Sequence, residues 1–222
     1  MNSVKVGLLT IGQSPREDIT TEIGPLFLPH IDIVEAGLLD NLSPAEIGQL
    51  QPESGETLLV SRLRDGSQVR LSEPKISALL PEVIHSMKKK IRVQAVGLLC
   101  THDFPETKSY PSVISPYNYL NFLITEMLQI QHLGAVVPLE NQIEMTTKKW
   151  RMREIIVEAK SPYAEEKNWE EIAQRLTREN VEAVVLDCIG YKMEDRRELQ
   201  RLISLPVLLP RVILAYAINQ LF

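Results

Sequence analysis

The sequence predicts an α/β fold made of two related halves with mainly parallel sheets. Short apolar runs alternate with longer amphipathic stretches along all 222 residues, which is the pattern of βαβ units. Two segments that end in the two cysteines of the chain also resemble one another. With 44% hydrophobic residues, the chain can bury a sizeable core in one large or two small domains.

Each apolar run predicts a strand and each amphipathic stretch a helix. The predicted strands cover residues 4–11, 31–37, 57–62, 93–100, 134–138, 155–159, 183–188 and 207–209. The predicted helices cover residues 15–27, 73–90, 117–130, 143–153, 168–179, 194–202 and 211–221.

Local signals add three details to this pattern. Ser43-Pro44-Ala45-Glu46 combines an N-cap, a proline at N1 and a carboxylate at N3, so a short helix begins there. Asp65-Gly66 predicts a hairpin turn that interrupts the parallel order. Lys88-Lys89-Lys90 is typical of a helix C-terminus, where cations complement exposed carbonyls, more than of a phosphate-binding patch.

An internal comparison indicates that the two halves are related. Residues 93–100 align with residues 181–188 without a gap, and valine, alanine, valine, leucine and cysteine coincide. Each segment follows a charged helix end and finishes on its cysteine. Apolar strands resemble one another easily, so chance similarity stays open as an alternative. The shared cysteine argues against chance because the chain has only two.

Cysteines at strand ends point to chemistry, because ligands of open parallel sheets bind outside the carboxyl ends of the strands. If the halves face each other, Cys100 and Cys188 approach one ligand from opposite sides. One thiolate then removes a proton from carbon while the other thiol returns a proton to the opposite face. The alternative is that each cysteine is a small buried hydrophobe.

Two other roles for these cysteines find little support in the sequence. A redox disulfide would be typical of a Cys-x-x-Cys motif, which the chain lacks. The four histidines have no ligand spacing with the cysteines, so no zinc or other metal site is predicted.

The segment from Gly12 to Asp18 follows the first predicted strand and opens a helix. Ser14 is a good N-cap and Pro15 a good N1 residue, so free backbone N–H groups would point outward there. With Arg16, this loop predicts a carboxylate or phosphate clamp. The glycine spacing of a P-loop or of a dinucleotide-binding turn is absent. The alternative is a well-capped turn with a solvated Arg16.

The residues beside the two cysteines supply further candidates. Thr101 offers a hydroxyl, and His102 either tunes Cys100 or lies on the surface. Gly190 would allow a ligand to approach the backbone. Strand alternation turns the side chain of Asp187 to the other face, so it is expected to orient a neighbouring backbone group or hydroxyl instead of pairing with the thiol.

Three more residues are interpreted from their positions in predicted helices. Arg211, at the start of the last predicted helix, is a weaker candidate for binding an anion. Trp150 and Trp169 lie in amphipathic helical stretches, so they are interpreted as packing residues.

Charge and hydropathy limit the partners. A net charge of −5 argues against nucleic-acid binding, which needs a basic face. No apolar stretch approaches about 18 residues and no signal peptide is recognisable, so a cytoplasmic protein without membrane contact is expected. Two cysteines without a secretory signal make a structural disulfide unexpected. The sequence leaves the formation of a homo-oligomer open.

Three motifs together resemble the AroM family, within the aspartate/glutamate racemase superfamily. They are residues 9–16 (LTIGQSPR), Leu99-Cys100-Thr101 with Phe104, and residues 186–191 (LDCIGY). The resemblance runs nearly from end to end. It implies two pseudo-symmetric Rossmann-like lobes with parallel sheets and an interlobe cleft. Lobe one would contain residues 1–113 and 206–222, so that the last strand and helix return to it, and lobe two residues 114–205.

The same resemblance implies a site without a cofactor. Cys100 and Cys188 would be the catalytic residues. The implied substrate-binding residues are Gln13, Ser14, Arg16, Thr101, His102, Gly190 and Tyr191. The chain departs from the amino-acid racemases, which carry Asp-Ser where it has Gly12-Gln13-Ser14, and the residues after both cysteines also differ. The AroM pattern itself has glycine where this chain has His102.

Two functional hypotheses follow. The first is a cofactor-independent enzyme with racemase-type or isomerase-type chemistry on a small carboxylate, decarboxylation being a further option. The second is a non-catalytic protein that binds a small carboxylate on the same fold. A third, a subunit of a larger assembly, has only the hydrophobic C-terminal helix in its favour, and core packing explains that helix equally well.

Overall fold

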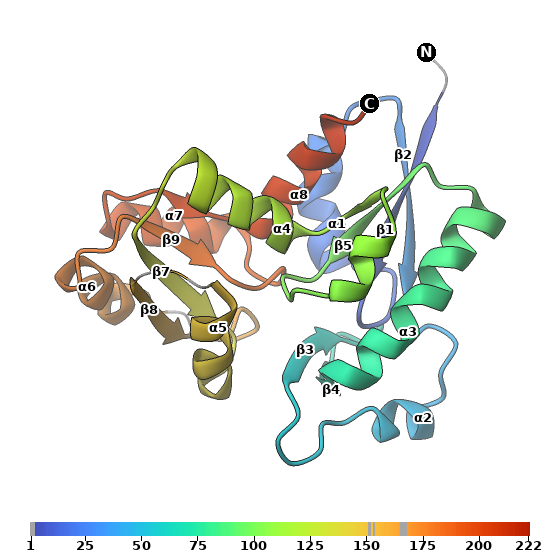
Figure 1. Ribbon diagram of the computed structural model, residues 1–222, viewed down its shortest axis with the longest axis horizontal. Coiled ribbons are helices and arrows are strands. Elements are labelled where there is room, and N and C mark those ends of the chain that lie inside the picture. The colour runs from blue at the N-terminus through green and yellow to red at the C-terminus, as the bar shows by residue number, and fades with distance from the viewer. Residues whose placement is uncertain (1–2, 151, 153, 165–167) are drawn as a thin grey trace. The chain divides into compact units, whose positions relative to one another are not determined.

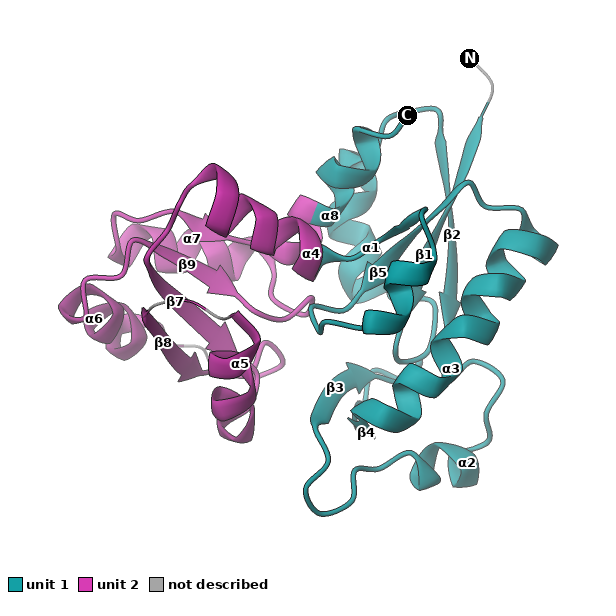
Figure 2. Cartoon of the chain, viewed as in Figure 1, with its two compact units in different colours: residues 1–116, 214–222 teal, residues 117–213 magenta. Residues whose placement is uncertain are grey.

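The computed structural model describes residues 3–150, 152, 154–164 and 168–222. The chain forms two compact units, shown in different colours in Figure 2. Unit 1 contains Met1–Pro116 and Leu214–Phe222, and unit 2 contains Tyr117–Ile213. Each unit has its own parallel sheet, so the predicted α/β class is confirmed. In the described part of the chain, no helix is both long and apolar enough to cross a membrane.

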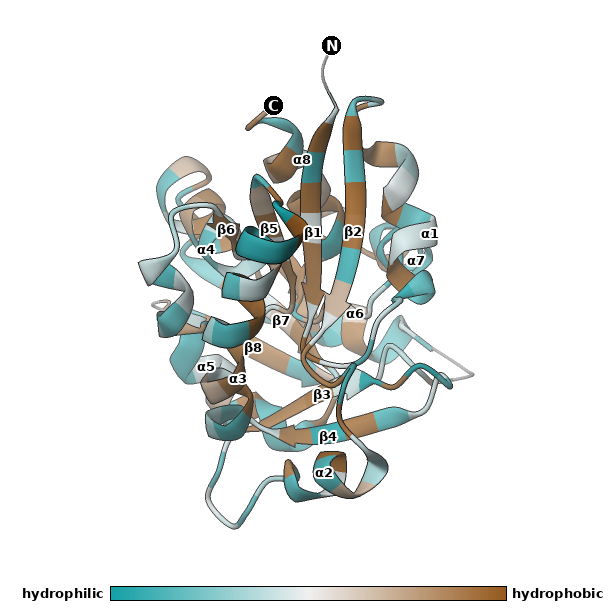
Figure 3. Cartoon of the chain, turned by 90° about the vertical axis from the view of Figure 1, so that its right-hand side faces the viewer, coloured by the Kyte–Doolittle hydropathy of each residue, from teal (hydrophilic) through white to brown (hydrophobic). Residues whose placement is uncertain are grey.

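Unit 1 is built on a four-stranded sheet with the order β2-β1-β5-β6. Its strands are β1 (Val4–Thr10), β2 (Ile31–Gly37), β5 (Ala95–Leu99) and β6 (Val113–Ile114), all parallel to their neighbours (Figure 1). Figure 3 shows hydrophobic residues along β1 and alternating hydrophilic bands along β2. Every residue of β5 is buried, as expected of an inner strand covered on both faces.

The helices of unit 1 lie between these strands in the sequence. They are α1 (Glu17–Ile23) with the 3₁₀ turn η1 (Gly24–Leu26), α2 (Pro44–Gln49), α3 (Glu73–Ser86) with the π-turn η2 (Met87–Ile91), and the 3₁₀ turn η3 (Pro105–Ser109). Helix α2 begins with the predicted capping box, since the Ser43 hydroxyl accepts from the amide of Glu46 and the Glu46 carboxylate accepts from the amide of Ser43. The lysine run falls in η2, at the predicted helix end.

A separate hairpin interrupts the parallel order of unit 1. Strands β3 (Leu58–Arg62) and β4 (Gln68–Ser72) pair antiparallel. Gly66 in the connecting turn has a φ of 83°, a conformation that glycine adopts without steric cost. The predicted turn at Asp65-Gly66 is therefore confirmed.

Unit 2 repeats the architecture with a second parallel sheet, ordered β10-β9-β7-β8. Its strands are β7 (His132–Val137), β8 (Glu154–Ala159), β9 (Ala183–Leu186) and β10 (Val207–Leu208). Its helical segments are α4 (Pro116–Phe122) with the π-turn η4 (Leu123–Met127), the 3₁₀ turn η5 (Glu140–Gln142), α5 (Ile143–Trp150), α6 (Glu170–Arg178), α7 (Met193–Leu202) and α8 (Pro210–Asn219). Helix α8 continues from unit 2 into unit 1.

Several element boundaries differ from those predicted. Strand β6 was not predicted, because two residues are too few for a periodic signal. The predicted helices at 73–90 and 117–130 end in π-turns instead of regular helix. The predicted helix at 143–153 ends at Trp150, and residues 151 and 153 lie outside the described residues.

The two sheets have the same strand order when each is read from the edge strand that comes second in its sequence, which is β2 in unit 1 and β8 in unit 2. In unit 1 this order is β2-β1-β5-β6, and in unit 2 it is β8-β7-β9-β10. Strand β5 therefore corresponds to β9. Backbone hydrogen bonds agree, because the amide of Gln94 donates to Lys5 O and the amide of Glu182 donates to His132 O, both at 2.8 Å. The internal similarity of residues 93–100 and 181–188 thus reflects equivalent strands.

The helix ends before these equivalent strands also correspond. Arg92 and Asn180 are left-handed residues with φ of 61° and 53°. The next amide in each unit closes the helix, from Val93 to Met87 O and from Val181 to Leu176 O, both at 3.3 Å. The first bond spans one residue more than the second, which is the extra residue of a π-turn. The repeat therefore includes the approach to each strand.

The expectation that the last strand belongs to the first lobe is wrong. Strand β10 pairs with β9 in unit 2, with Val207 opposite Val184 and Leu208 opposite Val185. Helix α7 and a short loop connect these two strands, and a strand that follows such a crossover returns beside its predecessor in the same sheet. Of residues 206–222, which were expected in lobe one, only residues 214–222 belong to unit 1.

Candidate functional site

The loop after β1 is held by a carboxylate from the loop after β2. Asp40 accepts hydrogen bonds from the amide of Ser14 at 2.7 Å and from its hydroxyl at 2.6 Å. The prediction that Ser14 caps the first helix is therefore wrong. Helix α1 begins at Glu17, and Arg16 occupies its N-cap position without a side-chain cap. Both donors of Ser14 bond instead to the charged oxygens of Asp40, which are strong acceptors.

Arg16 is buried, with 2% of its surface exposed, so the alternative of a solvated arginine is also wrong. Its Nε and Nη2 atoms each lie 2.8 Å from a carboxylate oxygen of Asp18. Its Nη1 atom donates to the hydroxyls of Thr10 and Ser61. Burial of a guanidinium requires such pairing. Arg16 thus fastens the loop to β1, α1 and the hairpin.

The hairpin of β3 and β4 packs directly on this loop. The amide of Gln13 donates to Arg62 O at 3.1 Å, and its side-chain oxygen accepts from the amide of Arg64 at 3.0 Å. A Cβ atom on Gly12 would lie 2.2 Å from Arg62 O, which explains why only glycine fits there. The hairpin backbone therefore completes the wall of the loop.

Arg64 is a functional candidate that the sequence interpretation missed. Its Nε donates to Ser14 O at 2.7 Å, and its Nη2 lies 3.3 Å from an oxygen of Asp40. Its side chain remains 56% exposed, so it places a positive charge in solvent beside the loop. The turn signal at residues 65–66 predicted the hairpin, but no local signal indicated where the hairpin packs.

Cys100 lies directly after β5, and 9% of its surface is exposed. It belongs to the core cluster that includes Leu9, Ile11 and Phe104. Strands β5 and β1 are neighbours, with Leu99 opposite Thr10. The cysteine and the Gln13–Arg16 loop therefore leave the sheet at the same edge.

The two residues after Cys100 are not on the open surface. Thr101 is buried. The His102 side chain is 15% exposed, with its Nε2 atom 3.7 Å from a carboxylate oxygen of Glu73. Its ring meets Phe104 edge-on at 4.8 Å between centroids. The surface alternative for His102 is therefore wrong, whereas its influence on Cys100 stays a prediction.

Cys188 lies in a tight turn after β9, with 8% of its surface exposed. Its amide donates to Leu186 O, and its carbonyl accepts from the amide of Tyr191 at 3.3 Å. The amide of Gly190 points to the sulfur, at 3.4 Å from Sγ. An N–H group in this position stabilises a thiolate more than a thiol.

Two tyrosines lie at this turn, Tyr163 beside Gly190 and Tyr191 itself. A Cβ atom on Gly190 would lie 2.6 Å from the hydroxyl oxygen of Tyr163, so the absence of a side chain admits that hydroxyl. Tyr191 is fully buried and its hydroxyl donates to Lys160 O. Burial, followed by the charges of Cys188 and Asp195, raises the pKa of Tyr191 well above its ordinary value. Tyr191 is therefore neutral.

Asp187 forms a buried ion pair. Its Oδ2 atom lies 2.5 Å from Lys149 Nζ and accepts from the indole N–H of Trp150 at 2.9 Å. The two charged side chains are only 1% and 7% exposed. Trp150 is buried as predicted but also donates this bond. Lys149 was missed, because a lysine in an amphipathic helix is ordinarily a solvated residue.

The other residues singled out from the sequence have structural roles. Trp169 is buried and lies 6.1 Å from the Tyr191 ring. Arg211 is fully buried, and its Nε donates to Ile189 O at 3.0 Å. It therefore braces the Cys188 turn.

The structure thus places the predicted residues in two groups, one at the carboxyl edge of each sheet. Unit 1 holds Gln13, Ser14, Arg16, Cys100, Thr101 and His102, and unit 2 holds Cys188, Gly190 and Tyr191. Each cysteine follows the equivalent strand of its unit. The two units thus share one α/β architecture, with a thiol after the matching strand of each parallel sheet.

Solved structures share this fold at low sequence identity. Allantoin racemase from Klebsiella pneumoniae is 14% identical, with a TM-score of 0.61 over 99% of this chain and 87% of that one. The maleate isomerase Iso from Pseudomonas putida S16 is 12% identical, with a TM-score of 0.61 over 99% and 93%. Glutamate racemase from Francisella tularensis subsp. tularensis SCHU S4 is 12% identical, with a TM-score of 0.58 over 100% and 81%.

Sequence comparison gives the family itself. The AroM protein family model matches residues 6–222, and no curated protein matches the chain. The chain belongs to the AroM family, as its motifs predicted.

Proposed function

We propose that this AroM protein is a cofactor-independent enzyme that acts on a small carboxylate through Cys100 and Cys188, with racemase-type or isomerase-type chemistry. The observation that carries the proposal is the correspondence of β5 and β9. Each strand ends at its sheet's carboxyl edge and is followed by a cysteine, where ligands of parallel sheets bind.

The proposed reaction consists of two proton transfers at one carbon. The thiolate of one cysteine takes a proton from the carbon next to the substrate carboxylate, forming S–H and a carbanion delocalised into the carboxylate. The thiol of the other cysteine gives a proton to the opposite face of that carbon and becomes a thiolate. Atoms and charges balance without a cofactor. The N–H of Gly190, aimed at Cys188 Sγ, favours Cys188 as the group that starts as the thiolate.

The remaining residues are assigned to binding. Thr101 supplies a hydroxyl at the edge where Cys100 lies, and Arg64 adds an exposed cation beside Ser14. Gln13 and Ser14, whose side chains already donate to Leu39 O and Asp40, form the loop beside which the carboxylate is bound. Arg16 is already paired with Asp18, so its role is to hold the loop in shape for the carboxylate. His102, Gly190 and Tyr191 shape the surroundings of the two thiols.

The structural relatives support this reaction class. They are named as an allantoin racemase, a maleate isomerase, a glutamate racemase and an arylmalonate decarboxylase. Racemisation and decarboxylation each include abstraction or return of a proton at carbon. The substrate of this chain is therefore sought among small carboxylates and amides.

The test is turnover that depends on the thiols. Cys100→Ser, Cys188→Ser and the double variant are assayed beside wild type with small dicarboxylates and amino acids, following racemisation, isomerisation, CO₂ release and uptake of deuterium from D₂O. Each single variant is expected to lose at least about 100-fold in kcat, since general acid–base catalysis contributes 10²–10⁴-fold. Thr146→Ser, a change at another buried residue, serves as the control. Turnover that survives in the double variant, or no turnover by wild type on any compound, overturns the proposal.

A second candidate is a protein that binds a small carboxylate without converting it. The residues after both cysteines favour it, because Cys100-Thr101-His102 and Cys188-Ile189-Gly190 depart from the pattern of the amino-acid racemases. A thermal-shift screen distinguishes the two. A ligand that stabilises wild type and the double serine variant equally, without turnover, supports the binding protein, and thiol-dependent turnover excludes it.

A further inference from the structure

A buried ion pair lies next to Cys188 in unit 2. Asp187, the residue before the cysteine, accepts from Lys149 and Trp150 at the end of α5. Lys149 Nζ also lies 5.1 Å from the Trp150 ring centre and 5.5 Å from that of Tyr117. The Tyr117 hydroxyl donates to Lys149 O at 3.0 Å. The charge pair thus belongs to a cluster of four residues from three segments.

Stability is a weak reason for such a pair. Removing two charges from water costs several kcal/mol per ion, and apolar residues of similar volume are often equally stable. Buried charge pairs, which shift the pKa values of neighbouring groups, are found often at functional sites. Here the pair lies one residue from a candidate catalytic thiol, and both Asp187 and Cys188 act electrostatically on the hydroxyl of Tyr191. Asp187 and Cys188 are both buried, with 5% and 8% of their surfaces exposed, so the carboxylate and the sulfur are both poorly solvated.

We infer that Lys149 and Asp187 form a charge-balanced positioning pair that keeps the thiol of Cys188 reactive near neutral pH. Asp187 holds the end of β9 against α5, and Lys149 cancels the negative charge that would otherwise oppose formation of the thiolate. Both are positioning residues, since they act through Cys188. The inference rests on the proposed function only in taking Cys188 as the reacting thiol.

Other groups act on the same turn and stay constant in the test. The Tyr191 hydroxyl is neutral, and the Tyr163 hydroxyl lies at Gly190. Asp195, buried on α7, accepts from the amide of Lys192 at 2.8 Å. Arg211 donates to Ile189 O. None of these residues changes in the variants below.

The experiment measures the alkylation rate of Cys188 by iodoacetamide against pH, in a Cys100→Ser background so that one thiol reacts. Asp187→Asn keeps an oxygen for the indole N–H but leaves the lysine cation unbalanced, so the pH midpoint of alkylation is expected to fall by about one unit. Lys149→Met leaves the carboxylate unbalanced. The midpoint is then expected to rise by about one unit, because a nearby negative charge disfavours the thiolate. The double variant should return close to the parent.

A matched control is available on the same helix. Lys148 and Glu144 form an exposed pair, with side chains 75% and 82% exposed, so Lys148→Met is expected to leave the midpoint unchanged because solvent screens it. Trp150→Phe keeps both charges but removes one donor to Asp187, so a smaller upward shift is expected. It provides a second measurement if either charge variant does not fold.

Opposite shifts in the two single variants support the inference, because a merely structural role moves both in the same direction. Equal shifts, no shift, or loss of folding in both variants by circular dichroism overturns it. Alkylation needs no substrate. Absence of turnover would therefore contradict the proposed function but not the role of the Lys149–Asp187 pair. Absence of opposite shifts would contradict the role of this pair but not the proposed function.

Discussion

The carboxylate of Asp40 binds both hydrogen-bond donors of Ser14, at 2.7 Å from the amide and 2.6 Å from the hydroxyl. The same side chain accepts from the amide of Gly37 at 2.7 Å. One acidic residue after β2 therefore determines the shape of the loop after β1. The motif of residues 9–16 ends in this loop. Asp40, which holds the loop, lies outside the motif.

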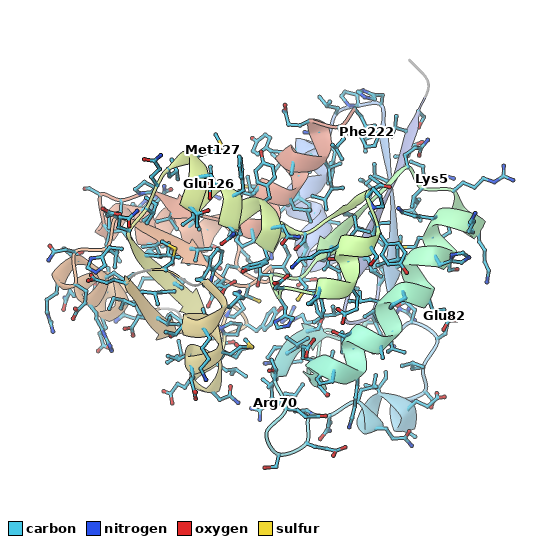
Figure 4. All side chains as sticks on the ribbon, in the orientation of Figure 1. Lys5, Arg70, Glu82, Glu126, Met127 and Phe222 are labelled. Carbon is cyan, nitrogen blue, oxygen red and sulfur yellow. The ribbon has the colours of Figure 1, made fainter. Side chains whose placement is uncertain are left out.

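Asp40→Ala is expected to lower the free energy of unfolding by about 2 kcal/mol, the magnitude of a lost hydrogen bond to a charged group. Asp40→Asn should lose less, because its carbonyl oxygen still accepts from one donor. Urea denaturation followed by fluorescence measures both. Glu82→Gln is the control, since Glu82 is exposed on α3 and labelled in Figure 4. A loss in Asp40→Ala no larger than in this control would contradict the importance of the Ser14 contacts.

Gly12→Ala is expected to destabilise the protein by about 2 kcal/mol, within the range for overpacking. The new Cβ would meet the backbone oxygen of Arg62 at 2.2 Å, and a backbone atom cannot rotate away. Gly48→Ala is the matched control, because Gly48 lies in α2 with no atom within 4 Å of its Cβ position. It should be neutral or stabilising. Equal thermal melting of the two variants would show that the hairpin does not approach Gly12 closely.

Arg64→Gln is expected to weaken binding of a small carboxylate several-fold, because the exposed guanidinium beside Ser14 attracts anions. Isothermal titration with the ligand found in the screen measures the affinity. Arg70→Gln on the same hairpin removes an equal charge from an exposed position, labelled in Figure 4, and should change the affinity little. Similar losses in both variants would mean that the effect is general charge and not the position of Arg64.

Wild type is expected to lose stability in alkaline solution through Tyr191. The folded state keeps this phenol protonated because its pKa is raised by burial, whereas the unfolded state releases the proton above about pH 10. The unfolded state then binds fewer protons, so the free energy of unfolding falls as pH rises. Tyr191→Phe should fall less between pH 9 and 11, as measured by urea denaturation.

Tyr119→Phe is the control for this pH dependence, because Tyr119 is 39% exposed. It should follow the wild-type pH dependence. If Tyr191→Phe follows the same curve as well, folding does not raise the pKa of Tyr191, which contradicts the effect of burial on this phenol.

Local patterns were sufficient for most of the elements. The capping box at Ser43 and the turn at Gly66 were predicted because the chemistry lies within four neighbouring residues. The positions of Cys100 and Cys188 at strand ends were predicted because the apolar runs stop there. The correspondence of their strands was visible because the repeat preserved side chains.

Contacts between distant residues were not predictable in the same way. Ser14 was expected to cap a helix, since nothing near it in the sequence announces Asp40. The partner of β10 was missed because the resemblance suggested the other lobe, while the short connection through α7 decided the pairing. Lys149 was missed since its partner is 38 residues away.

By itself, the sequence determined the α/β class, the AroM resemblance and the two cysteines at matching strand ends, because periodicity and motifs are properties of neighbouring residues. Only the tertiary structure decided which polar and charged groups meet, as in Arg16 with Ser61, Ser14 with Asp40, and Lys149 with Asp187. Buried charges take whichever partner the packed elements bring within hydrogen-bond distance. That choice depends on how strands, loops and the hairpin pack, which no local pattern encodes.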